Sequence, residues 1–123
     1  MQVNNFSKRI RPFVDRELAE ARQQEEHGDK DTAFAHLERA HVLGQASTRE
    51  HVRTHALMLF WAVRQRKLSE AIGQVMRIVG AATKTAIGWV PEGNTGGARI
   101  SPFKRLPIPD DLAQQIAAAK RRD

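Results

Sequence analysis

Apolar residues recur every three or four positions from residue 6 to residue 79, a spacing that predicts an all-α protein. The first run predicts a helix that extends to about Glu26. Pro12 lies inside this run, so the helix is either kinked there or starts near it. The predicted inner face of this helix consists of Phe6, Ile10, Phe13, Val14, Leu18 and Ala21.

The segment "HGDKD" separates the first helix from a second one. Asp29 or Asp31 is the expected N-cap, and Gly44 is suited to end the helix. The predicted inner face of the second helix holds Ala33, Leu37, Ala40 and Gly44.

Two further helices follow. Ser47 with Glu50 forms a capping-box pattern that starts the third helix. Apolar periodicity predicts that Val52, Ala56, Leu59, Phe60 and Val63 of the third helix point inward. The apolar face predicted for the fourth helix consists of Leu68, Ala71, Ile72, Val75, Met76 and Val79.

Four helices joined by short turns predict a four-helix bundle made of two antiparallel hairpins. The small residues of "GDKDTAFAHLERA" resemble a tetratricopeptide repeat (TPR), so the bundle is expected to be TPR-like. Residues 1–84 form this bundle, and residues 85–123 form an extended Gly/Pro-rich C-terminal tail that packs on it. Asp110 is the expected cap of a short terminal helix, and the whole is expected to be one domain.

The chain has 123 residues, 41% of them hydrophobic, and no cysteine. No apolar run approaches the ~18 residues that a membrane span needs, and no signal peptide is recognised, so a cytoplasmic location is expected. Without cysteine, histidine and carboxylate are the strong metal ligands that remain.

The net charge of +6 is spread along the chain rather than clustered. Aromatic and basic residues are not interleaved, and no nucleic-acid-binding motif is recognised. These features argue against a nucleic acid as partner.

Residues 36–58 hold four of the five histidines. In two antiparallel helices, residues equally far from the turn lie at the same height, because each residue rises about 1.5 Å. A turn near residue 46 therefore places His41 level with His51, and His55 lies one turn further along the same face. A turn near residue 29 places Glu17 level with His41.

Three imidazoles and one carboxylate are ligand types for a divalent transition metal such as zinc, iron, manganese or copper. The predicted metal ligands are Glu17, His41, His51 and His55, with Glu38, Gln45 or Glu50 as hydrogen-bond acceptors behind them. The chain lacks the HExxH motif of metalloproteases, because Val52 follows His51. Metal homeostasis, sensing or a metal-dependent activity would fit, and no substrate is indicated.

Two alternatives remain open. Glu17 can instead pair with Arg39, Arg53 or a protonated histidine in a structural network that needs no metal. In that case the protein would be a TPR-like adaptor that binds a protein partner or a second copy of itself. His36 lies about 140° from His41 around the helix and is placed outside the ligand set.

The chain also resembles a known family. The segments "LERAHVLGQ", the HxxxH that follows and "GNTGG" are similar to the bacterial DUF3703 family of unknown function, over nearly the whole chain. The resemblance implies a small helical protein without an established activity. "GNTGG" itself is interpreted as a turn, with Asn94 and Gly96 or Gly97 at positive φ, that folds the tail over the histidines.

Overall fold

A computed structural model of the chain describes residues 2–86, 94–97 and 104–121. Within these residues the protein consists of helices and has no strand. The helices are α1 (Gln2–Glu26), α2 (Lys30–Gly44), α3 (Thr48–Arg64), α4 (Leu68–Ala86) and α5 (Asp110–Lys120). The predicted all-α class is confirmed. None of these helices is long and apolar enough to cross a membrane.

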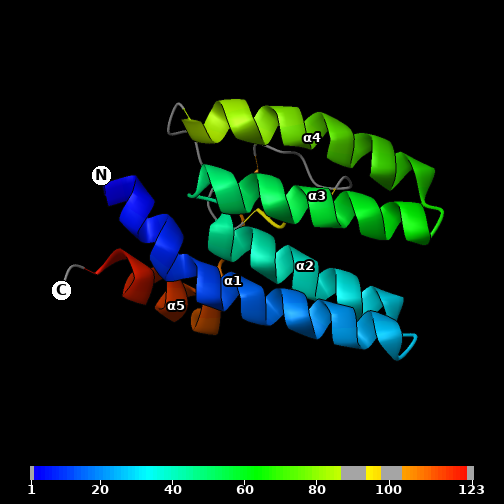
Figure 1. Cartoon of the computed structure of the whole chain (residues 1–123), viewed down its shortest axis with the longest axis horizontal. Helices are drawn as coiled ribbons and strands as arrows, with labels where there is room; N and C mark the ends of the chain where they lie inside the picture. The colour runs from blue at the N-terminus through cyan, green and yellow to red at the C-terminus, as the bar shows by residue number, and fades with distance from the viewer. Residues whose placement is uncertain (1, 87–93, 98–103, 122–123) are drawn as a thin grey trace.

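The helices stack in chain order (Figure 1). α1 pairs with α2 in one hairpin, and α3 pairs with α4 in the other. The two hairpins contact each other through α2 and α3. α1 and α4 are therefore the outer helices of the stack, and the short α5 lies against α1 and α2. The prediction of two hairpins and a terminal helix is confirmed.

The turns between helices follow the sequence signals. Asp29 caps α2, because its Oδ1 accepts a hydrogen bond from the Thr32 backbone N–H at 3.1 Å. The Ser47 hydroxyl caps α3 by accepting from the Glu50 backbone N–H at 3.3 Å. The prediction for α5 was wrong in detail: Asp110 is its first helical residue, and the cap position is held by a proline without a side-chain hydrogen bond.

The apolar core lies mainly among α1, α2 and α5. The predicted inner face of α1 is buried except for Phe13, which is partly buried, and α1 continues through Pro12. The predicted inner face of α2 is also buried. The largest fully buried apolar side chains are Ile10, Val14, Leu43, Met58 and Leu112.

The orientation predicted for the second hairpin was wrong. Phe60 and Val63 of α3 are 54% and 60% exposed, and most of the apolar face predicted for α4 points outward. α3 instead buries a largely polar face, which contains Glu50, His51, Thr54, His55, Met58, Trp61 and Ala62. α4 turns Ala71, Gln74 and Ala81 inward. Periodicity identifies an apolar face, but it cannot tell whether that face meets the core or another surface.

Candidate metal centre

Three histidines meet in the interior of the bundle. His41 comes from the end of α2, and His51 and His55 come from successive turns of α3. The side chains are 2–4% exposed, and their ring centroids lie 4.6–5.0 Å apart. One ring nitrogen from each residue lies within 4.8 Å of the other two. The spacing is suited to a single metal ion bound by all three imidazoles.

His41 is held by the C-terminal tail. Its Nδ1 lies 2.7 Å from the backbone oxygen of Asn94. A carbonyl oxygen can only accept, so Nδ1 of His41 carries a proton. In the neutral ring Nε2 is then the nitrogen that carries the lone pair.

His55 is held by α4 in the same way. Its Nδ1 lies 2.6 Å from Oε1 of Gln74, whose side chain is fully buried. The Gln74 Nε2 donates to the Glu70 carboxylate at 2.6 Å and to the Gly96 carbonyl at 2.9 Å, and this fixes the orientation of the amide. Oε1 must therefore accept, and Nδ1 of His55 also carries a proton.

These two hydrogen bonds determine how the rings face each other. The Nε2 atoms of His41 and His55 lie 3.1 Å apart. If both rings are neutral, two lone pairs point at one another, which is repulsive. A cation between them, either a proton or a metal ion, removes the repulsion. Two Zn–N bonds of about 2.05 Å at a tetrahedral angle would separate the nitrogens by roughly 3.3 Å, close to the observed distance.

Residues 94–97 of the tail lie directly on this cluster. Gly96 has φ +82°, and a Cβ placed on it would lie 2.5–2.9 Å from atoms of the His41 ring. Only glycine allows this approach. The Gly96 N–H donates to Oδ1 of Asn94 at 2.9 Å, so the turn is closed on itself as well as on the histidines. The positive φ predicted for Gly96 is confirmed, whereas the positive φ predicted for Asn94 was wrong. The apolar tail residues 87–93 and 98–103 lie outside the described residues.

Two carboxylates lie close behind the cluster. Glu70 binds Gln74, as described above, and Glu38 lies on α2 one turn before His41. Burial raises the pKa of Glu38, a hydrogen bond from Thr95 opposes the rise, and the nearby charge of Glu70 raises it further. The negative charge of Glu70, which accepts a hydrogen bond from the glutamine that orients His55, favours a cation in the histidine cluster.

Glu17 is not brought to the three histidines. Its Oε1 accepts from His36 Nδ1 at 2.8 Å and from Arg39 Nε at 3.0 Å. Two residues at equal height on paired helices can still point in different directions around their helix axes. At about 100° per residue, Arg39 lies about 160° around α2 from His41, so the side chain that Glu17 contacts points away from the histidines. The group of converging ligand atoms found among the described residues contains three histidines and no carboxylate. The placement of Glu17 matches the structural pairing with Arg39 that the sequence left open.

The other candidate residues are not among the three whose ligand atoms converge. Gln45 is buried near the end of α2. Glu50 is fully buried, and its Oε1 accepts from Arg53 Nη1 at 2.8 Å, while its Oε2 has no partner among the described residues. His27 is exposed, and His36 belongs to the Glu17 network.

Sequence reasoning did not identify Gln74 and Asn94 as the residues that orient the histidines. A signal for Gln74 exists: it is an uncharged polar residue on a helix whose apolar stripe faces the other way. The role of Asn94 depends on its backbone oxygen, which no side-chain pattern reveals. The acceptors observed for His41 and His55 are thus the backbone oxygen of Asn94 and the side chain of Gln74.

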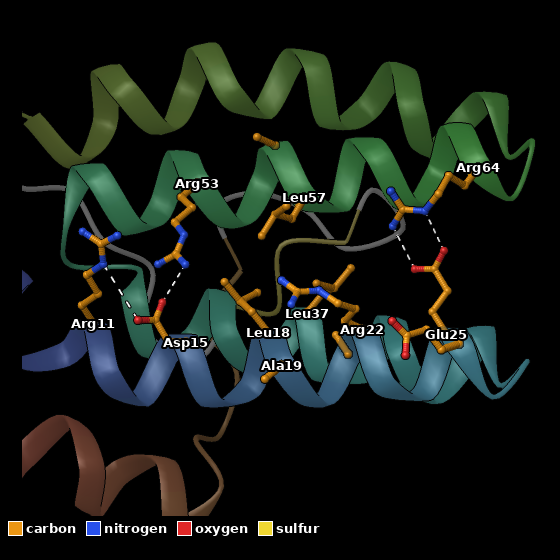
Figure 2. Close-up of a pocket in the computed structure, with 13 residues that line it drawn as sticks. Arg11, Asp15, Leu18, Ala19, Arg22, Glu25, Leu37, Arg53, Leu57 and Arg64 are labelled. Atoms are coloured by element: carbon orange, nitrogen blue, oxygen red, sulfur yellow. Dashed lines mark hydrogen bonds and ion pairs between the residues drawn. The ribbon is translucent and has the colours of Figure 1, made fainter.

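A separate groove of about 880 Å³ runs between α1 and α3, above α2 (Figure 2). Ion pairs cross it from α3 to α1: Arg53 with Asp15 at 2.6 Å, and Arg64 with Glu25 at 2.6 Å. Its lining is of mixed charge over a small apolar floor. The described tail residues do not line it.

The chain matches a known protein family. The model of the DUF3703 family, described as a protein of unknown function, matches residues 8–116. No curated protein and no solved structure matches the chain.

Proposed function

We propose that this chain, which belongs to the DUF3703 family of proteins of unknown function, binds a divalent transition metal ion through His41, His51 and His55. The single observation that carries the proposal is the 3.1 Å approach of two Nε2 atoms whose rings both use Nδ1 as a donor. A metal ion shared by the rings would satisfy this arrangement, and the third imidazole lies within reach of the same point.

A shared proton is the competing explanation. It would make one ring an imidazolium, a buried charge that is costly away from water. A metal ion uses all three rings, and the hydrogen bonds at Nδ1 are of the kind that orient histidine ligands and increase their basicity.

Three protein ligands leave room for water or another small ligand on a tetrahedral metal. The site therefore fits storage or sensing, and it fits catalysis if such a water is activated. Zinc, iron, manganese and copper all accept imidazole, so the choice of metal is left to the experiment.

The test is elemental analysis of protein purified without a histidine tag. We expect one metal ion per chain in the parent and none in the His51→Ala, His55→Ala double variant. The matched control is His27→Ala, His36→Ala, which removes two histidines outside the cluster and is expected to retain the metal. Glu17→Gln is also expected to retain it. Helical circular dichroism checks that each variant is folded.

Metal-free protein would refute the proposal if its melting temperature also stays unchanged on addition of zinc, iron, manganese or copper, because a ligand that binds only the folded state must raise that temperature. Retention of a stoichiometric metal by the double variant would equally show that the histidines are not its ligands.

The groove between α1 and α3 favours a second candidate function, the binding of a peptide in a TPR-like manner.

A further inference from the structure

The second hairpin exposes an unusual amount of apolar surface. Among the described residues, the large apolar side chains that are more than half exposed all lie on α3 and α4, at 51–73% exposure. We call this set the dry face. It consists of Phe60, Val63, Leu68, Ile72, Val75, Met76 and Val79.

The dry face is continuous across the hairpin. The α3–α4 turn lies near residue 66, so Phe60 is level with Ile72 in the antiparallel pair. On α4, Ile72 and Met76 lie about 160° from Gln74, which binds the tail. The dry face therefore points away from the tail and the histidines. α4 is an outer helix of the stack, so no described helix covers it (Figure 1).

The α4 part of the dry face is also free of exposed charge. None of the exposed positions in residues 68–83 of α4 carries a charge. The other outer helix provides an internal comparison, because the exposed side of α1 carries many charges, including Lys8, Arg11, Asp15, Arg16 and Glu20. A solvated helix normally resembles α1. An apolar face of this size on a soluble helix marks an interaction surface.

The area matches that of a stable protein interface. A large apolar residue has roughly 200 Å² of surface, so the seven side chains of the dry face expose on the order of 800 Å². A standard-size interface takes about 800 Å² from each partner.

We infer that the dry face is the interface of a homodimer, in which the α3–α4 hairpins of two copies pack as a four-helix bundle. An apolar face complements a copy of itself, as a two-fold interface requires. Each chain carries a formal charge of +6, so two copies repel over most of their surface. The charge-free face of α4 allows them to approach without opposing like charges.

Light scattering after size exclusion, in the presence of a chelator, tests the inference at micromolar protein concentration. The expected mass is 27.6 kDa, twice the 13.8 kDa of the chain. Met76→Lys, Val79→Lys is expected to elute as a 13.8 kDa monomer with unchanged helical circular dichroism, because both side chains are mostly exposed in the single chain. Gln23→Lys, Ala35→Lys, which adds the same charge at exposed positions of α1 and α2, is expected to remain a dimer.

A monomeric parent protein would overturn the inference, including the case in which the monomer binds lipid vesicles or another protein through the dry face. A double variant that stays folded and dimeric would overturn it too, because another surface would then form the dimer. The chelator excludes dimers bridged by metal, so the outcome is independent of the proposed metal site.

Discussion

Gly96→Ala is the most informative single substitution for the contact between the tail and the histidine cluster. The new methyl group would lie 2.5 Å from Cδ2 of His41. The ring would have to move by roughly 1 Å to reach an ordinary contact distance. Such a shift strains the hydrogen bond to Asn94 and changes the distance to His55.

The expected cost has two parts. An alanine at φ +82° costs about 1 kcal/mol in backbone strain. Displacement of the buried His41 from its partners adds about 1–3 kcal/mol. The total of roughly 2–4 kcal/mol corresponds to a fall in melting temperature of about 8–16 °C for a chain of this size. Metal ligands must keep their distances within about 0.2 Å, so zinc affinity is expected to fall at least tenfold.

Substitutions at two other glycines allow the two contributions to the free-energy cost to be measured separately. Gly28 has φ +84° but open space around it, so Gly28→Ala measures the strain alone, about 1 kcal/mol. At Gly97 no positive φ is present and the nearest atom would be 3.5 Å away, so Gly97→Ala is expected to change stability by less than about 0.5 kcal/mol.

Urea unfolding gives the free energies, and competition with a chromophoric chelator gives the zinc affinities. If Gly96→Ala costs no more than Gly28→Ala and binds zinc as the parent does, the tail does not rest on His41. The contact between Gly96 and His41 would then not hold the cluster in place.

Two further predictions concern other parts of the molecule. Gln74→Leu removes the acceptor of His55 Nδ1, so zinc affinity should fall about 10- to 100-fold in the same competition assay. The control is Gln23→Leu at an exposed position of α1. An undiminished zinc affinity in Gln74→Leu would show that the amide does not orient the ring. The bidentate hydrogen bonds from Arg64 lower the pKa of Glu25, so its stabilisation is present above the unfolded value of about 4.5 and is lost as pH falls through the folded pKa. Glu25→Gln should therefore be up to about 1 kcal/mol less stable than the parent at neutral pH in urea unfolding, and the difference should vanish in acid; a difference that does not change with pH would contradict this.

Local sequence signals specify the helices and the turns. Asp29 and Ser47 act through backbone groups three residues away, so their capping can be predicted locally. The inner face of α1 was correctly predicted, because its other side is charged and only one face can be buried. Helix length and turn position also predicted that His41, His51 and His55 lie at neighbouring heights, and the structure brings these three residues together.

The direction in which each helix face points depends on how the helices pack together. The rotation of α1 against α2 directs the Glu17 carboxylate to His36 and Arg39. The apolar faces of α3 and α4 point outward because these helices pack through the polar side chains that include the histidines and Gln74. Periodicity gives the position of a residue around its own helix, whereas the neighbour that it meets depends on how whole helices rotate against each other, and that rotation is fixed only by packing over the entire bundle.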